Sequence, residues 1–221
     1  AYQQQMLFWG LTVWLIWRFT PVVIKRELGL LLLAVCGLLF AGCESEPGWR
    51  VDMLDIGQGL SVLVTQGHRA LLFDTGDAYP GGYNMADAAI FPMLEYRGVQ
   101  QLDYLVVSHR DKDHAANWQR IYQKYPQAHI VSSAKLNAET QICQRWQQWD
   151  WGQLQLTILS PQNSSGGDIN EDSCVLRISD GNHSVLLTGD VQHQAELELT
   201  NLPAGLLRSD ILSSPHHGSR S

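Results

Sequence analysis

Residues 108–114 read Ser-His-Arg-Asp-Lys-Asp-His, which places two imidazoles and two carboxylates in one short segment. The segment directly follows an apolar run at 102–107 that is typical of a buried strand. Imidazole and carboxylate groups are ligands for zinc, manganese and iron. Because residues two apart in an extended turn point the same way, His109 and Asp111 can hold one ion, and the last two residues of the segment a second. The alternative is a solvated charged loop.

Two later predicted strands are also followed directly by residues of the types that bind metals. The predicted strand at 183–188 leads into Gly189, which allows a sharp turn and leaves the Asp190 carboxylate at the strand tip. A strand at 210–214 leads into Pro-His-His-Gly-Ser, and since adjacent histidines point different ways, we expect one of His216 and His217 to reach a metal. Each segment alone is compatible with an ordinary turn or polar loop. Together, three strand tips with ligand-type residues favour a metal centre.

The rest of the pattern predicts short strands with helices inserted between groups of them. The runs at 61–65 and 70–74 resemble a hairpin, and helical spacing at 85–97 stops at Gly98. A second helix is expected at 115–125. The other predicted strands are at 51–55, 102–107, 128–132, 154–159, 173–179, 183–188 and 210–214. This order favours an α+β fold with two sheets sandwiched between helices over a doubly wound parallel sheet.

The first part of the chain has the composition of a membrane segment. Residues 28–43 carry no charged side chain and follow Lys25 and Arg26, which predicts a transmembrane helix with the later residues on the non-cytoplasmic side. A second apolar stretch covers 6–24. The alternatives are a buried soluble helix, or a lipoprotein signal that ends at Cys43.

These features predict three parts. Residues 1–43 are the end of a polytopic membrane domain made of hydrophobic helices, 44–48 are a polar linker, and 49–221 are a hydrolase domain large enough to bury a core. The chain starts without Met and stops directly after its last motif, so we expect a fragment of a longer protein.

Charge and cysteine content narrow the function only slightly. The chain has a net charge of −7, and since the charges before Trp49 cancel, the expected soluble domain has the same net charge. This balance argues against simple affinity for nucleic acid, although bound metal ions supply local positive charge. Cys143 and Cys174 lack C-x-x-C spacing, and we expect them to be packing residues, with a disulfide left open.

The motifs together resemble a known family. The pattern H-x-D-x-D-H after a strand, with a later T-G-D and H-H-G-S, resembles the metallo-β-lactamase superfamily. The segments VDMLDIGQG (51–59), LFDTG (72–76), LTGD (187–190) and HHGS (216–219) resemble the C-terminal domain of the ComEC family of competence DNA-uptake channels. The resemblance covers nearly all of 49–221. It implies an αββα sandwich, here with its C-terminal part truncated, preceded by a transmembrane helix segment.

The resemblance also implies a set of metal ligands. His109, Asp111, Asp113 and His114 would be central ligands, Asp190 a carboxylate that bridges two metals, and His216 or His217 the completing ligand. Asp74 would brace the metal loop without touching the metals.

Two departures from the superfamily pattern concern the metals. Asp111 stands where histidine is commonest, and this carboxylate favours manganese or magnesium over zinc. The further histidine that the superfamily often supplies before T-G-D has no counterpart, because His129 and His183 are poorly placed. The matching region is 170–173, where Asp172 is a substitute candidate.

The implied activity is that of a metal-dependent nuclease that degrades one DNA strand while the other enters the membrane channel. It would use two divalent ions, manganese favoured and zinc or magnesium as alternatives, with Asp113 and whichever of His216 and His217 is not a ligand in catalytic roles. The implied partners are single-stranded DNA, the inner membrane and other DNA-uptake proteins. The implied location is the bacterial inner membrane, multi-pass, with the hydrolase domain on the periplasmic or extracellular side. The alternatives are a metallo-hydrolase acting on a lactam, thioester or small phosphodiester, and a non-catalytic DNA-guiding domain.

Overall fold

The computed structural model describes residues 48–162 and 170–219, together with the isolated positions 14, 18, 27, 29–31 and 35. The chain divides into two units, Ala1–Glu46 and Pro47–Ser221. The predicted membrane helices at 6–24 and 28–43 lie almost wholly outside the described residues. Among the residues that are described, no helix has the length and apolar character needed to cross a bilayer.

The first sheet of the second unit contains the metal-loop strand. Its strands, in spatial order, are β1 (Arg50–Met53), β2 (Val62–Gln66), β3 (Arg69–Phe73), β4 (Gln101–Val107), β5 (His129–Ser132) and β6 (Gln141–Ile142). The β1, β2 and β3 strands pair antiparallel, whereas β3 to β6 pair parallel. Since β3 and β4 are parallel neighbours, the residues that follow both strands lie at the same edge of the sheet.

The second sheet carries the other two predicted strand tips. Its spatial order is β11 (Ile211–Leu212), β10 (Ser184–Leu187), β9 (Val175–Ser179), β8 (Leu154–Ser160) and β7 (Gln148–Trp151). All neighbours are antiparallel except β10 and β11, which are parallel. The ends of β10 and β11 therefore lie side by side, and each leads into one of the predicted ligand segments.

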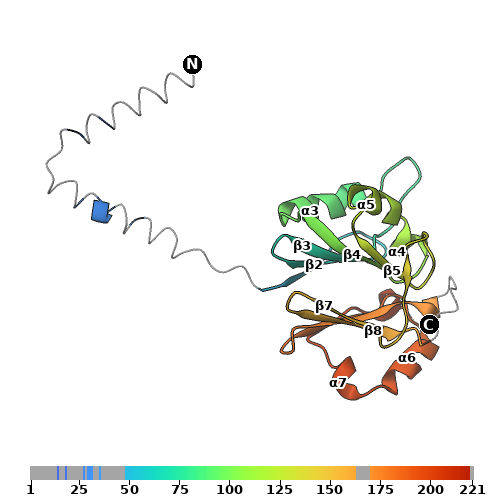
Figure 1. Ribbon diagram of the computed structural model, residues 1–221. Helices are drawn as coiled ribbons and strands as arrows, with labels where there is room; N and C mark the ends of the chain where they lie inside the picture. The colour runs from blue at the N-terminus through green and yellow to red at the C-terminus, as the bar shows by residue number, and fades with distance from the viewer. Residues whose placement is uncertain are drawn as a thin grey trace. The chain divides into compact units, whose positions relative to one another are not determined.

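Helices cover the outer face of each sheet (Figure 1). The first sheet is covered by η1 (Ala86–Ile90), α3 (Phe91–Tyr96) and α5 (Trp118–Lys124), and the second by α6 (His193–Thr200) and α7 (Ala204–Leu207). Three short helices lie in connections: α4 (Lys112–Ala115), η2 (Asn170–Asp172) and η3 (Pro215–Gly218). The predicted αββα sandwich is confirmed.

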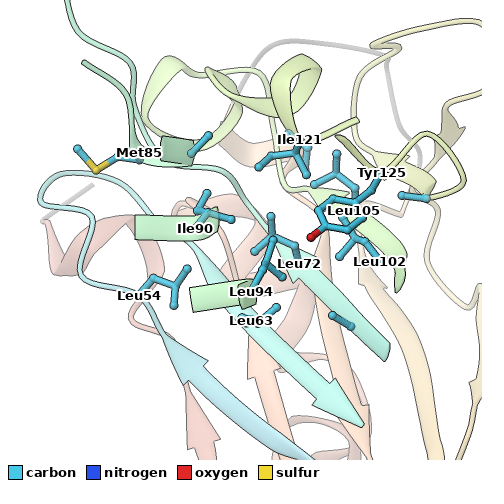
Figure 2. Packing of buried hydrophobic residues seen from close by; sticks show 14 of the residues in the cluster. Leu54, Leu63, Leu72, Met85, Ile90, Leu94, Leu102, Leu105, Ile121 and Tyr125 are labelled. Atoms are coloured by element: carbon cyan, nitrogen blue, oxygen red, sulfur yellow. The ribbon is translucent and has the colours of Figure 1, made fainter. Parts of the chain in front are cut away.

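The apolar run of β4 explains the layering. Leu105 and Val107 pack in the cluster beneath the helices, and Val106 and Tyr104 belong to the cluster between the sheets. Neighbouring residues of a strand face opposite sides, so a strand covered on both faces needs an unbroken apolar sequence. Figure 2 shows the helix-side cluster, where leucines of the first sheet meet Ile90, Leu94 and Ile121 of the helices.

Several sequence-based predictions need correction. The helix predicted at 115–125 is two helices, α4 and α5, and the first begins inside the metal-binding segment, at Lys112. The strands β6 and β7 and the helix α7 were not predicted because each has four residues or fewer. Helix α6 has eight residues, but its sequence HQAELELT shows little amphipathic spacing, so it was missed as well. The interpretation of Cys143 and Cys174 as mere packing residues is wrong: they form a disulfide with Cα atoms 5.9 Å apart. Cys143 follows β6 directly and Cys174 precedes β9, so the bond joins the two sheets.

Candidate metal centre

The strand tips bring four of the predicted ligands together. Ligand atoms of Asp113, His114, Asp190 and His217 all lie within 4.8 Å of one another. Nε2 of His114 is 3.1 Å from Oδ1 of Asp190 and 3.2 Å from Nε2 of His217. Nε2 of His217 is 3.3 Å from Oδ2 of both Asp113 and Asp190. Two imidazole nitrogens and two carboxylates facing one point form a ligand set suited to a divalent cation.

Local backbone geometry sets these positions. Asp111 has extended φ and ψ of −62° and 147° and precedes the first turn of α4, so Asp113 and His114 project from that turn. Gly189 has a φ of 54°, and a Cβ there would lie 2.7 Å from the Cβ of Ser108. Only glycine therefore allows the end of β10 to approach the metal loop closely enough to place Asp190.

Asp74 lies behind His114. Its Oδ2 is 2.8 Å from Nδ1 of His114, and its Oδ1 accepts from the Ser108 N–H at 2.6 Å. Ser108 Oγ donates to Asp74 Oδ2 at 2.8 Å. A carboxylate that holds the far ring nitrogen fixes the tautomer of a histidine ligand and leaves its Nε2 facing the cluster.

The charges around His114 favour a cation. Burial by itself lowers the pKa of His114, but the charges of Asp74 and Asp190 and its hydrogen bonds to both outweigh this and raise the pKa to about 10. Burial likewise raises the pKa of Asp190, yet the hydrogen bond and charge of His114 lower it overall. The carboxylates around His114 thus stabilise positive charge at this position, which a bound divalent cation would also supply.

His109 presents a free ligand atom beside the cluster. Its side chain is buried, and its Nε2 has no hydrogen-bond partner. Its Nδ1 lies 3.0 Å from Ser108 Oγ and 3.4 Å from Ser173 Oγ. Burial, together with the charge of His114, lowers the pKa of His109, so the imidazole is neutral. A buried neutral imidazole with an unused nitrogen is costly unless it binds something, which fits a metal ligand.

The predicted ion site of His109 and Asp111 has fewer ligands than the predicted site of Asp113 and His114. Asp111 Oδ2 lies 3.5 Å from His109 Nε2, and the Asp111 side chain is 52% exposed. Asp172 lies with Glu171 along a cavity beside α6 and is not a member of the four-residue cluster. His129 and His183 are both exposed and are also not members. The residues present fit one well-defined site, around His217, and a second, sparser one around His109.

Of the two adjacent histidines of η3, only one belongs to the four-residue cluster. Both have positive φ, 46° for His216 and 53° for His217. His217 joins the cluster, while His216 turns away, with its ring centre 6.4 Å from that of His217. Nδ1 of His216 is buried and has no hydrogen-bond partner.

Hydrogen bonds of Thr75, Asn117 and Ser213, for which no sequence pattern indicated a function, hold the strand tips and the metal loop in place. Thr75 Oγ1 donates to the His114 carbonyl at 2.9 Å, and Asn117 Nδ2 donates to the carbonyls of residues 75–77. Ser213 Oγ accepts from the Thr188 N–H at 2.9 Å, which ties the tips of β10 and β11 together. Serine, threonine and asparagine are common in loops of every kind, so no sequence signal marked them out.

Comparison with known proteins identifies the superfamily of the chain. A model of the metallo-beta-lactamase superfamily matches residues 54–219, and the chain belongs to this superfamily. Among solved structures, Rm3 metallo-beta-lactamase has a TM-score of 0.55 and 15% identity, covering 80% of this chain and 83% of that chain. The subclass B3 metallo-beta-lactamase MEM-A1, from a soil metagenome library, has a TM-score of 0.51 and 15% identity, covering 77% of both chains. At this identity, the structural likeness concerns the fold alone.

The sequence relatives are more specific, and they confirm the resemblance to the ComEC family. The chain is 36% identical to Recombination protein 2 of Haemophilus influenzae over 201 residues, and 37% identical to Competence protein ComA of Neisseria gonorrhoeae over 205 residues. Each match covers 90% of this chain but only 25% and 28% of those proteins. The chain thus spans about a quarter of the length of these curated relatives.

Proposed function

We propose that residues 49–221 form a metal-dependent phosphodiesterase that hydrolyses DNA, degrading the strand that is not transported during natural transformation. The observation that carries the proposal is the convergence of Asp113, His114, Asp190 and His217 within 4.8 Å. The DNA substrate is inferred from the competence and recombination proteins among the relatives.

Each side chain has a distinct task in this proposal. Asp113, His114 and His217 would hold one ion, His109 and Asp111 would hold the other, and Asp190 would be shared between the two sites. Bound divalent ions, with manganese favoured and zinc or magnesium as alternatives, stabilise charge on phosphate oxygens and make water a better nucleophile near neutral pH. Asp74 keeps His114 in orientation through the 2.8 Å contact to its Nδ1. His216, which is outside the cluster, is the candidate for a protonating role at the leaving oxygen.

The proposed location is the bacterial inner membrane, with this domain on the periplasmic or extracellular side. The disulfide between Cys143 and Cys174 supports this side, because such bonds persist in oxidising compartments and are rare in the cytosol. The proposed partners are single-stranded DNA, the membrane and other DNA-uptake proteins.

The test uses the whole chain in detergent, loaded with manganese. It is offered labelled single-stranded DNA, bis(p-nitrophenyl) phosphate and a β-lactam in parallel. We expect DNA cleavage that is lost with EDTA and in Asp113→Ala. Glu95→Ala is the matched control, because this carboxylate is 74% exposed on α3 and pairs with Lys124, away from the cluster. It should cleave at the wild-type rate.

The other outcomes each contradict the proposal in a defined way. Turnover of the small diester or the lactam without DNA cleavage would assign a different hydrolase. Manganese binding without turnover of any substrate would indicate a DNA-guiding domain, an alternative favoured by the sparse ligand set around His109.

A further inference from the structure

A short hairpin between β3 and η1 presents two tyrosines. It is closed by the isolated Ala78–Asn84 bridge, and the N–H of Tyr79 donates to the carbonyl of Tyr83 at 2.7 Å. Gly81 and Gly82 form its tip with φ of 93° and 92°, which other residues rarely adopt. The two rings are 5.8 Å apart between centres, with 34° between their planes. The tight turn therefore holds both rings in a defined arrangement, referred to below as the tyrosine hairpin (residues 78–84).

The tyrosine hairpin is attached to the metal loop. Asp77, at its base, accepts from Lys112 Nζ at 3.0 Å, and its carbonyl accepts from Asn117 Nδ2 at 2.9 Å. Lys112 Nζ also lies 5.6 Å from the centre of the Tyr79 ring. Lys112 immediately precedes Asp113, whose carboxylate belongs to the metal cluster. The hairpin and the cluster thus share one rigid support.

A cavity of about 360 Å³ adjoins the rings. It is lined by Asp55, Ile56, Gly57, Tyr79, Tyr83 and Met85. The Tyr83 side chain is 59% exposed, whereas Met85 is buried and belongs to the helix-side core of Figure 2. The cavity therefore combines aromatic rings, an apolar floor and one carboxylate, that of Asp55.

We propose that the tyrosine hairpin is a stacking site for a base of single-stranded DNA whose backbone reaches the metal centre. The inference rests on the proposed function, and it adds the subsite that positions the strand. Stacking on tyrosine suits any planar, uncharged base, whereas the Asp55 carboxylate disfavours a phosphate in the same cavity. The Lys112 ammonium is 61% exposed, pairs with Asp77 and lies 5.6 Å from the Tyr79 ring centre, so it is placed to meet a phosphate next to the stacked base.

The overall charge strengthens the case for stacking. Proteins that hold DNA by its backbone use clusters of lysine and arginine, and their affinity comes mainly from phosphate contacts. This chain has a net charge of −7, which gives it no general attraction for a polyanion. Aromatic stacking supplies affinity that does not depend on net charge, and the hairpin offers it next to the metal loop.

The test measures binding of the whole chain to a labelled thymidine oligomer and to an abasic strand of equal length. EDTA is present, so that no hydrolysis occurs. Tyr83→Ala should weaken binding of the thymidine oligomer by about fivefold or more, the effect of losing one stacked base. Tyr83→Phe, which keeps the ring, should bind within about twofold of the wild type by the same reasoning. Tyr96→Ala removes a tyrosine that is 76% exposed on α3 and should not change binding.

The abasic strand has the same phosphates but no bases, so it shows how much of the binding comes from the bases. The wild type should bind it more weakly than the thymidine oligomer, and Tyr83→Ala should bind it with the same affinity as the wild type. Equal binding of both strands by the wild type would overturn the inference, as would a loss in Tyr83→Ala that is equally large for both strands. Because binding is measured without metal, the hairpin result stands even when DNA cleavage fails. Conversely, cleavage that depends on Asp113 with no effect of Tyr83 on binding would leave the proposed function intact and remove the stacking site.

Discussion

Oδ2 of Asp74 lies 2.8 Å from Nδ1 of His114, and both side chains are fully buried. The contact links the end of β3 to the turn of α4, so the strand that contributes no metal ligand still determines how one ligand points. Asp74 itself has a φ of 60°, a left-handed conformation that aspartate and asparagine tolerate better than most residues.

The first prediction concerns this contact. Asp74→Asn keeps the shape and the tolerated backbone conformation but removes the charge behind His114. We expect manganese affinity to fall by about 10- to 100-fold, the usual effect of losing a partner behind a metal ligand. Calorimetric titration of the metal-free chain measures this loss. Asp87→Asn serves as the control, since its exposed pair with Arg120 contributes little. Unchanged affinity in Asp74→Asn would show that the contact does not act on the metal.

The second prediction concerns the disulfide. Cys174 follows Ser173, whose Oγ lies 3.4 Å from Nδ1 of His109, so the bond anchors the strand end behind the sparser ion site. The bond joins residues 31 apart, and replacing both cysteines by alanine should reduce the free energy of unfolding by about 3–4 kcal/mol. Urea unfolding of the wild type, of the wild type with dithiothreitol, and of Cys143→Ala/Cys174→Ala measures this. The reduced wild type should resemble the variant, and identical midpoints in all three samples would exclude the bond.

The third prediction separates the adjacent histidines. His217 lies in the cluster, 3.2 Å from Nε2 of His114, whereas His216 does not. His217→Ala should lower the number of manganese ions bound tightly, and His216→Ala should leave this number unchanged. Metal analysis after gel filtration at low free manganese gives both values. The reverse pattern would mean that the backbone of η3 turns the other way when metal binds.

The strand tips explain why much of the centre could be predicted from sequence. Apolar strands and the ligand-type residues that follow them are local patterns, so the expected segments around Asp113, Asp190 and His217 lie where the strands end. The choice between His216 and His217 was left open, because it depends on two positive φ angles in η3 that no local pattern indicates. Short elements such as β6, with two residues, have too few positions to show a period.

Other features depend on packing between distant segments. Cys143 and Cys174 meet only because the two sheets stack, and nothing in their spacing indicates this. The supporting role of Ser173 likewise arises from the approach of two separate strand ends, one carrying His109 and the other Ser173. The sparse ligand set around His109 agrees with the absence of a further histidine in the sequence. By contrast, Asp172, the substitute candidate, lies beside α6 and outside the cluster.

The fourth prediction concerns a buried carboxylate that joins the sheets away from the metals. Asp103 on β4 is 5% exposed. Its Oδ2 accepts from Trp151 Nε1 of β7 and from Arg69 Nε of β3, both at 2.7 Å, and its Oδ1 accepts from Gln101 Nε2. Trp151→Phe keeps most of the apolar surface but removes one donor to a charged acceptor. The free energy of unfolding should fall by about 1.5–3 kcal/mol, the range for a hydrogen bond to a charged group.

The matched control for this variant is Trp149→Phe, on the same strand. Trp149 is only partly buried and packs at the edge of the cluster between the sheets, so its replacement should cost clearly less. Manganese affinity should be unchanged in both variants, because neither tryptophan belongs to the metal cluster or contacts Asp74. A loss in Trp151→Phe that is no larger than the loss in Trp149→Phe would mean that the indole N–H contributes little and that Arg69 and Gln101 suffice to satisfy Asp103. Equal stability of Trp151→Phe and the wild type would lead to the same conclusion, because an unmade bond to a buried carboxylate otherwise carries a cost.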